Sequence, residues 1–485
     1  MKWKTCEQWK LRNWPAGICL MQDELPLVTD WLNSKPVYYN VRTRKVGRVP
    51  ATLIDHEDLV FHSEGLANYL AYGYSVFGQT PLENLKFLAP CERISRDKDG
   101  ELVIEKMDDP VDRYESYRDS EEEIVSRVSE AIETRFAQLA FDEELILPLS
   151  GGFDSRLLAA LIPKGVPTRC FTYGLSENQS ESFEVMRAKA VADRLGLQWQ
   201  RVELGEYNKL IGEWINRYGP VMHSHGMYQM EFYSKIGQLV DKGCVLSGFF
   251  GDVWAGSMIP PDVATDQDVQ KMSYSHGLNA DCSQLLMPWE SELTREYYFQ
   301  NKGRIADPRF RIISSVRMKS TLISYLLAVP EWLGSQVYTP FLSPEICLSM
   351  LNLPESRRRG RRWQVEYFQK KGLYVEQTIR KENRWNDLNR ISLDRCPVEC
   401  LSVSLLSALF QREYIEWINA NVNKSGWKYV GYRWPIPLPG ARIWKRLRRH
   451  DDQLKAYCAY LTIAPIQRIL EMKNGVNSYG RGNSN

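Results

Sequence analysis

Apolar and polar positions alternate regularly through the middle of this 485-residue chain. Apolar runs of strand length lie at 145–149, 168–175, 198–204 and 244–256, the last ending in glycines, and segments with helical spacing of apolar residues lie between them. Strands that alternate with helices in this way predict a doubly wound parallel sheet, which binds ligands at the carboxyl ends of its strands. From about residue 285 onward the patterns are mainly helical, so we expect an α/β fold with a helical C-terminal part.

A polar, acidic segment at 107–119 precedes this region and indicates a domain boundary. Directly after it, Ser120 and Glu123 form the pattern of a helix capping box. Apolar residues at helical spacing follow, namely Ile124, Val128, Ile132 and Phe136. We therefore expect an α+β domain over residues 1–115 and an α/β domain over residues 120–485.

The first predicted strand leads into the glycine-rich stretch LPLSGGFDSR at 147–156. A strand, a glycine loop and an apolar helix in succession direct backbone N–H groups and the positive end of a helix dipole at an anion. Ser150 and Ser155 add hydroxyl donors, whereas Asp154 would repel a phosphate unless a cation such as Mg²⁺ lay between them. The stretch lacks the Gly-Lys-Ser/Thr ending of a Walker loop. A plainer alternative is a turn that uses glycine only for its geometry.

A second loop of the same kind follows a later strand, with the sequence Ser-Gly-Phe-Phe-Gly-Asp at 247–252. In a parallel sheet, Asp252 and Asp154 would lie at the ends of neighbouring strands and could share one Mg²⁺ on a triphosphate. The alternative for each acid alone is a helix N-cap, which is a common use of Asp after a strand.

Composition and cysteine usage are those of a globular intracellular protein. No apolar run reaches the roughly 18 residues that suggest a membrane span. Met1-Lys2-Trp3-Lys4 is not followed by the apolar core of a signal peptide, so we expect a cytoplasmic location. The ten cysteines are scattered without close pairs, which favours reduced thiols over a disulfide frame or a zinc site.

The net charge of +2 conceals a basic C-terminal third. Residues 351–485 carry 25 lysines and arginines against 12 aspartates and glutamates, and the excess is greatest at 357–362 and 442–449. Such runs are usually solvated surface. The alternative is an anionic partner, for example a phosphorylated, nucleotide-linked or peptide substrate or a lipid surface. We expect no nucleic-acid partner, because the chain contains no nucleic-acid-binding motif.

His223 and His225 are separated by one residue just before a predicted helix. Two histidines without cysteine or acidic neighbours are more typical of a helix start or a polar pocket wall than of a metal site. His225 is also a candidate general base if it faces the predicted nucleotide site.

Four segments resemble the asparagine synthetase family in the order in which they occur there. Residues 150–155 resemble its pyrophosphate loop, and 247–256, SGFFGDVWAG, resembles a degenerate form of its second motif. Residues 338–354 are similar to a later family segment, and 74–94 to a stretch of the glutaminase half. The resemblance implies an adenine-nucleotide α-hydrolase-like sheet, preceded by a degenerate glutamine amidotransferase-like domain of the N-terminal-nucleophile-hydrolase type.

The resemblance also implies an activity and the residues that serve it. Family members use ATP to activate a carboxylate as an acyl-adenylate, release pyrophosphate and let ammonia or another amine displace AMP. By position, the pyrophosphate would be held by Ser150, Gly151, Gly152, Asp154 and Ser155. Mg²⁺ would be held by Asp154 and Asp252, and the adenosine pocket lined by Leu149, Tyr173, Ser247 and Gly248. The family's late lysine, which neutralises pyrophosphate, would be Lys381, for which the alternative is a surface lysine.

Several positions depart from the family pattern, and they restrict the activities and substrates that we expect. Glutamine-hydrolysing members expose an N-terminal cysteine, but here Met1 is followed by Lys2 and the first cysteine is Cys6, so we expect no glutaminase activity. This moves the chain toward the β-lactam synthetase and lasso-peptide cyclase branch. Substituted motif positions, which weaken the match to a true aspartate pocket, are Phe249, Val253, Gln336, Tyr338 and Ser343. They also favour a rival hypothesis, a non-catalytic nucleotide-binding or scaffold protein.

Overall fold

The computed structural model describes residues 24–138, 144–240, 243–273, 277–379, 382–424, 452–473 and 475. Several sequence-based expectations lie outside these residues. They concern the start of the chain at Met1 and Lys2, the first cysteine Cys6, the candidate Lys381 and the basic run at 442–449.

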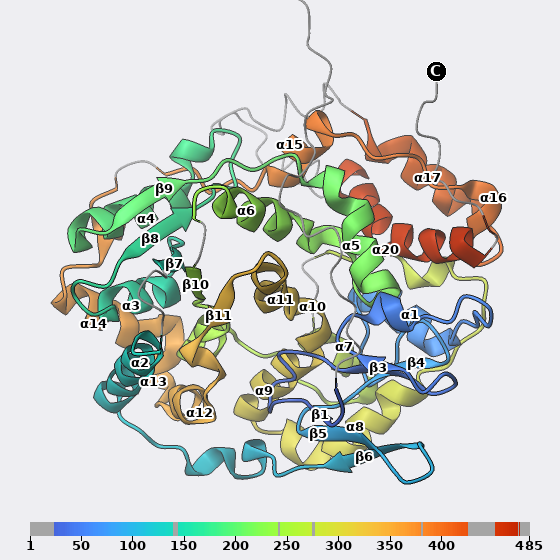
Figure 1. Cartoon of the computed structure of the whole chain (residues 1–485), viewed down its shortest axis with the longest axis horizontal. Coiled ribbons are helices and arrows are strands. Elements are labelled where there is room, and N and C mark those ends of the chain that lie inside the picture. The colour runs from blue at the N-terminus through green and yellow to red at the C-terminus, as the bar shows by residue number, and fades with distance from the viewer. Residues whose placement is uncertain are drawn as a thin grey trace, which may run out of the picture.

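A five-stranded parallel sheet forms the centre of the fold (Figure 1). Its order is β11 (Gln336–Tyr338), β10 (Gly243–Leu246), β7 (Glu144–Pro148), β8 (Thr168–Thr172) and β9 (Gln198–Arg201). All four strand pairings are parallel, which confirms the predicted sheet. The three leucine and isoleucine side chains in the middle of β7 are buried, as a strand covered on both faces requires.

Helices follow the strands where the apolar spacing predicts them. The pattern at 120–136 forms α2 (Glu121–Phe136), which begins with a complete capping box between Ser120 and Glu123. Helix α2 packs on α3 and α3 on α4. The helices of this region are α3 (Phe153–Leu161), α4 (Phe183–Leu195), α5 (Ile211–Tyr218) and α6 (Met227–Gly237).

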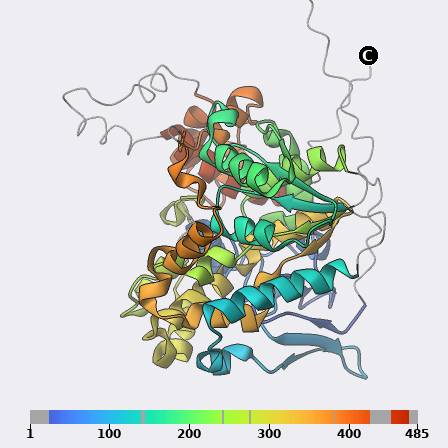
Figure 2. The ribbon, with the colours of Figure 1, turned by 90° about the vertical axis from the view of Figure 1, so that its left-hand side faces the viewer.

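The part that follows is mainly helical, as expected, apart from the short edge strand β11. Its helices are α7 (Val269–Met272), α8 (Glu292–Ile305), α9 (Pro308–Met318), α10 (Ser320–Ile323), α11 (Tyr325–Trp332), α12 (Pro344–Asn352), α13 (Glu355–Arg358), α14 (Arg362–Lys370), α15 (Leu388–Arg395), α16 (Val403–Leu406), α17 (Arg412–Val422) and α20 (Asp452–Lys473). Figures 1 and 2 show α17 and α20 at the end of the molecule opposite strands β5 and β6.

The N-terminal part is built from two small antiparallel sheets and one helix, α1 (Ser63–Tyr72). One sheet has the order β1 (Leu27–Val28), β5 (Glu92–Arg96), β6 (Leu102–Lys106). The other has the order β3 (Val46–Gly47), β2 (Tyr38–Asn40), β4 (Leu85–Phe87). Antiparallel strands with a separate helix agree with an α+β arrangement.

The N-terminal part and the central sheet share one continuous hydrophobic core. At the linker between them, Arg317 of α9 donates to both carboxylate oxygens of buried Asp109, at 2.8 and 2.7 Å. At the far side, the Tyr69 hydroxyl of α1 donates to the carbonyl oxygen of Thr462 in α20, at 2.8 Å. The N-terminal part and the linker are therefore also joined to helices of the C-terminal part, at α9 and at α20.

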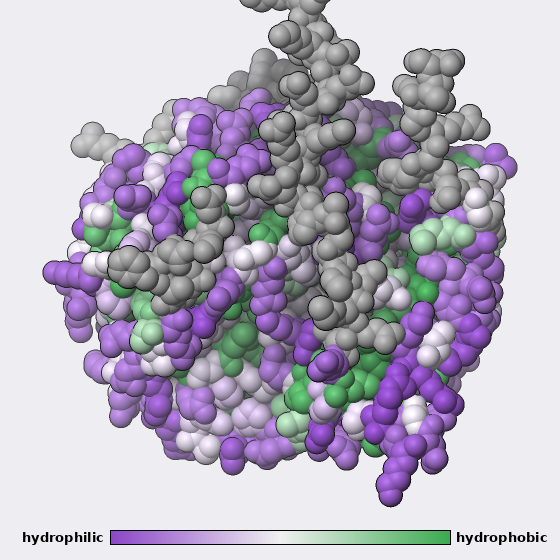
Figure 3. Space-filling model, in the orientation of Figure 1, coloured by the Kyte–Doolittle hydropathy of each residue, from purple (hydrophilic) through white to green (hydrophobic). Residues whose placement is uncertain are grey.

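Surface and cysteine chemistry agree with the composition. Hydrophilic side chains predominate on the face drawn in Figure 3. Within the described ranges no single helix is long and apolar enough to cross a membrane, and one bent pair, Pro308–Met318 with Ser320–Trp332, meets the criterion by length and composition only. The eight cysteines that the structure describes are all free thiols.

Candidate active site

A cavity of about 290 Å³ lies at the carboxyl edge of the central sheet, where β7, β8 and β10 end. We call it the nucleotide cavity. It brings together eight of the residues expected to bind nucleotide or metal: Leu149, Ser150, Asp154, Ser155, Tyr173, Ser247, Gly248 and Asp252. Gly151 and Gly152 are not among its lining residues, although they belong to the loop that closes it.

The first glycine loop folds around its own serines. The backbone N–H of Ser150 donates to the Ser155 hydroxyl at 3.0 Å, and that of Gly152 donates to the Ser150 hydroxyl at 3.1 Å. Gly152 is the N-cap of α3 and provides no side-chain cap. The first N–H groups of α3 are therefore left for another acceptor, as at the anion-binding start of a helix.

Glycines of the second loop allow it to lie directly against the first. A Cβ atom on Gly248 would come within 2.9 Å of the backbone nitrogen of Ser155. A Cβ atom on Gly251 would come within 2.9 Å of the Asp154 carboxylate. The two loops can therefore pack this closely because the second motif has glycine at positions 248 and 251.

The two aspartates line the same cavity and lie close enough for their charges to interact. Burial and the nearby charge of Asp252 raise the pKa of Asp154 to about 7, against the opposite effects of Arg361 and Gln364. The Arg361 guanidinium lies 3.4 Å from the Asp154 carboxylate, and the Gln364 amide 3.5 Å from it. The Ser257 hydroxyl donates to Asp252 at 3.0 Å. Two carboxylates held this close repel each other unless a cation or a proton lies between them.

This donor set fits a magnesium ion that is shared with phosphate. Among the described residues, no three or more His, Cys, Asp or Glu side chains form a cluster that could hold a metal ion by themselves. Mg²⁺ is usually held by one or two carboxylates, with the remaining positions filled by water and phosphate oxygens. Neither acid caps a helix with its side chain: Gly152 is the N-cap of α3, and Asp252 stands at the N-cap position of the short helix Val253–Ser257 but makes no side-chain capping bond.

The opposite wall of the cavity is aromatic. The Tyr173 ring packs edge-on against Phe232, with 5.0 Å between the ring centroids, and its hydroxyl accepts a hydrogen bond from Gln229 at 3.4 Å. The end of β7 is fixed to β8 by the Thr172 hydroxyl, which donates to the Leu149 carbonyl oxygen. A flat apolar surface with one polar contact suits a purine ring.

Two further charged residues, one in the cavity and one behind the first glycine loop, were not among the expected site residues. Glu184, in the first turn of α4, lines the cavity, and burial raises the pKa of its carboxyl to about 7 against the lowering effects of nearby backbone N–H groups and of Arg187. Arg156 is fully buried behind the loop and donates to the Gly151 carbonyl oxygen at 2.9 Å and to Glu376 at 2.8 and 3.0 Å. The sequence could have indicated Arg156 through its position directly after the SGGFDS stretch.

The substituted motif positions have mainly structural contacts. Phe249 lines the cavity and packs on Phe250 at a centroid distance of 3.7 Å, so an apolar ring occupies the place of a possible base. Gln336 accepts a hydrogen bond from Arg135, and Ser343 caps α12. The carbonyl oxygen of Tyr338 accepts from the backbone N–H of Ser247 at 2.8 Å.

The two histidines form a helix start, as the plainer hypothesis predicted. The Nδ1 atom of His223 accepts from the backbone N–H of His225 at 3.1 Å. Nε2 of His225 lies 3.1 Å from the Asn389 side-chain oxygen. Burial lowers the pKa of His223 to about 3 and that of His225 to about 4, and neither residue lines the nucleotide cavity.

The fold and the site together define an α/β protein with two glycine loops and two acids around one cavity at the carboxyl edge of a parallel sheet. Residues 127–256, which include both loops, match the family model of asparagine synthase. The matched segment, about a quarter of the chain, is therefore similar to the asparagine synthase family, whose members are typically ATP-dependent ligases. No curated protein matches the chain.

Proposed function

We propose that the protein is an ATP-dependent, AMP-forming ligase that activates a carboxylate as an acyl-adenylate and transfers the acyl group to ammonia or an amine. The observation that carries the proposal is the meeting of both glycine loops, with Asp154 and Asp252, in one cavity inside the family-matched region. Adenosine would lie against Leu149 and Tyr173, with Ser247 and Gly248 beneath it.

In the first step a carboxylate oxygen attacks the α-phosphorus, and the bond to the bridging oxygen breaks, so that pyrophosphate leaves with the electron pair. The N–H groups at the start of α3 and the hydroxyls of Ser150 and Ser155 would bind the phosphate oxygens, where negative charge increases. Asp154 and Asp252 would hold Mg²⁺, which supplies positive charge to the departing pyrophosphate.

In the second step the amine attacks the acyl carbon and AMP leaves. The proposed absence of glutaminase activity makes free ammonia or an amine of the substrate the nucleophile. In this scheme residues 1–115 are a degenerate amidotransferase-like domain and residues 120–485 the adenylating domain of a cytoplasmic enzyme. A carboxylate and an amine in one molecule would make the protein a cyclase of the β-lactam or lasso-peptide type.

A non-catalytic nucleotide-binding or scaffold protein is the rival proposal, and one observation favours it. Phe249 puts an apolar ring in the cavity, and Gln336 and Ser343 have structural partners. Against it stand the two facing carboxylates, which cost stability unless they bind a cation.

The test is release of AMP and pyrophosphate by the purified protein with Mg-ATP and a small-molecule extract of the host. Asp154→Ala should abolish release, whereas Asp193→Ala, which removes an exposed carboxylate on α4, should not change it. AMP release that survives in Asp154→Ala would contradict the proposed enzyme. Release by neither the wild type nor the variants, without nucleotide binding, would favour the scaffold.

A further inference from the structure

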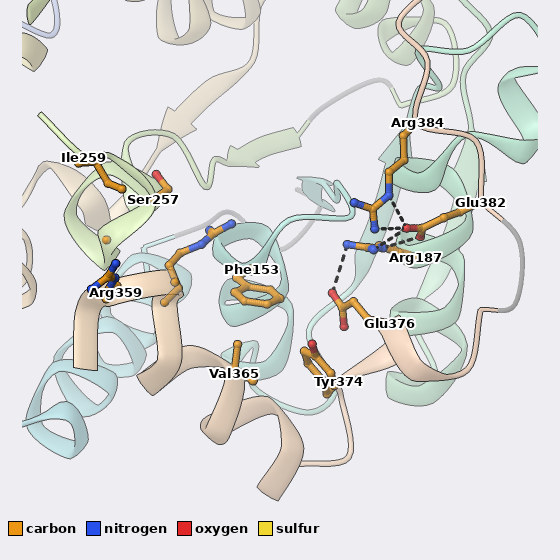
Figure 4. A pocket seen from close by; sticks show the side chains of 13 residues that line it. Phe153, Arg187, Ser257, Ile259, Arg359, Val365, Tyr374, Glu376, Glu382 and Arg384 are labelled. Atoms are coloured by element: carbon orange, nitrogen blue, oxygen red, sulfur yellow. Dashed lines mark hydrogen bonds and ion pairs between the residues drawn. The ribbon is translucent and has the colours of Figure 1, made fainter. Parts of the chain in front are cut away.

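A second cavity, of about 620 Å³, adjoins the nucleotide cavity on the other side of Phe153. Its charged side chains are arginines Arg187, Arg359, Arg361 and Arg384, together with Glu376 and Glu382, and we call it the arginine pocket. Figure 4 shows Arg187, Arg384 and the two glutamates on one side of Phe153 and Arg359 on the other.

The first side of the arginine pocket is internally neutralised. Arg187 donates to both oxygens of Glu382, at 2.8 and 2.7 Å, and lies 3.4 Å from Glu376. Arg384 also pairs with Glu382. Each guanidinium on this side already has a carboxylate partner, so this side has little charge to offer a ligand.

The second side is not neutralised. Arg359 is exposed and makes no hydrogen bond or ion pair with any residue that the structure describes. Arg361 has one carboxylate near it, that of Asp154 at 3.4 Å, and its guanidinium lies over the Phe153 ring at 4.7 Å from the centroid. On this side, two guanidinium groups therefore line the cavity with one carboxylate, that of Asp154, between them.

The rest of this basic run is used elsewhere. Arg357 is held by Glu121 and Glu366, and Arg362 pairs with Glu366 at 2.9 Å. Of the run at 357–362, only Arg359 and Arg361 have side chains that line the pocket. The basic segment is thus divided into a structural set and a pair that is open to a ligand.

The second glycine motif holds this pair in place. Gly256 has a φ of +107°, and a Cβ atom there would come within 2.1 Å of the Arg358 carbonyl oxygen. The indole N–H of Trp363 donates to the Ala255 carbonyl oxygen at 3.3 Å. Arg361 itself adopts a left-handed conformation with φ +55°, which costs a non-glycine residue energy and is typical of functional sites.

The two cavities meet at the two acids. Asp154 lines the nucleotide cavity and contacts Arg361, which lines the arginine pocket. Asp252 lines the nucleotide cavity and accepts from Ser257, which also lines the arginine pocket. A triphosphate that is bound at the first loop would therefore have its far end at the mouth of the arginine pocket.

We propose that Arg359 and Arg361 bind the pyrophosphate that leaves in the adenylation step. This inference rests on the proposed function and names a further pair of residues for it. When the bond between the α-phosphorus and the bridging oxygen breaks, the pyrophosphate takes the electron pair, and the guanidinium groups bind its oxygens in the planar, two-pronged geometry that arginine provides. Arg361 exchanges its contact with Asp154 for the pyrophosphate when Asp154 binds the metal.

The test is calorimetric titration of the full-length protein with Mg-pyrophosphate. We compare the wild type with Arg359→Gln, with the double variant Arg359→Gln/Arg361→Gln and with Lys381→Gln. Arg362→Gln is an exposed control from the same run as the arginine pair. The double variant should bind Mg-pyrophosphate at least about tenfold more weakly, because it loses two groups that make charge-assisted hydrogen bonds to the anion. Arg359→Gln should show part of the loss, and it removes no contact within the described chain, so its folding is not at risk.

A parallel titration with AMP separates this inference from the proposed function. Unchanged AMP affinity with weakened pyrophosphate binding supports the arginine pair. Equal pyrophosphate affinity in the double variant and the wild type overturns the pair, and a loss confined to Lys381→Gln returns the role to the lysine. Failure of the wild type to bind either AMP or Mg-pyrophosphate overturns the proposed function, and the inference with it.

Discussion

The nucleotide cavity and the arginine pocket are neighbours of opposite charge. The first contains the carboxylates of Asp154, Asp252 and Glu184. The second has the exposed guanidinium of Arg359 and that of Arg361, which contacts Asp154 at 3.4 Å. The acids belong to the central sheet region, whereas the arginines come from a helical segment some two hundred positions after Asp154 in the sequence. The proposed phosphate site therefore combines a local motif, which is visible in the sequence, with a distant pair of charges, which only the fold brings next to it.

The largest effect on AMP release is expected from substituting a carboxylate of the nucleotide cavity. Asp252→Asn should reduce AMP release on the order of 10³-fold, because the departing pyrophosphate loses the cation that its charge requires. Ser257→Ala removes one hydrogen bond to the same carboxylate and should cost less than about tenfold. The two rates are measured side by side with saturating Mg-ATP, and equal losses would mean that Asp252 only holds the loop.

Arg156 joins the first glycine loop to Glu376, which lines the arginine pocket. Arg156→Met should lower the free energy of unfolding by about 3–5 kcal/mol, since it removes the fully buried guanidinium and leaves Glu376 only the 3.4 Å contact with Arg187. Arg412→Met, which breaks an exposed pair with Glu416, should cost no more than about 1 kcal/mol. Urea denaturation measures both, and similar midpoints would show that the buried pair does not hold the loop.

A methyl group added at Gly256 should displace the segment that carries Arg359 and Arg361. Gly256→Ala should destabilise the protein by about 3 kcal/mol, because a Cβ atom meets the Arg358 carbonyl and the backbone is left-handed there. Gly360→Ala is the matched control, with φ +63° and open space around it, and should cost about 1 kcal/mol. Thermal denaturation compares the two, and only Gly256→Ala should also weaken Mg-pyrophosphate binding.

The smallest effect is expected at the ion pair between Arg317 and Asp109. Burial opposes ionisation of Asp109, but the hydrogen bonds and charge of Arg317 outweigh it and lower the pKa of this carboxyl below its ordinary 3.8. Stability from this pair is therefore present above the ordinary pKa and is lost as the pH falls through the lowered value. In denaturation at neutral pH and near pH 3, Asp109→Asn should flatten this loss, and an unchanged pH dependence would contradict the assignment.

The sequence predicted the parallel sheet and both glycine loops because each depends on residues that are close together in the chain. The apolar run before Ser150 is long enough to show a buried strand, and the glycines after it show the turn. Edge strand β11 was missed, since its three residues are too few for a period to be seen. Glu184 was missed because its place in the cavity comes from packing between distant segments. The basic run at 357–362 was noted with an anionic partner as the alternative, but the sequence could not show which of its arginines line a pocket.

The most direct test of the account is calorimetric binding of a non-hydrolysable ATP analogue, first with Mg²⁺ and then with a chelator, to the wild type and to Asp154→Asn. The account predicts that Mg²⁺ strengthens binding to the wild type at least about tenfold and leaves the affinity of Asp154→Asn almost unchanged. Binding that is equally strong without Mg²⁺, or no binding by the wild type, would contradict the assignment of Asp154 and Asp252 to a metal-dependent nucleotide site.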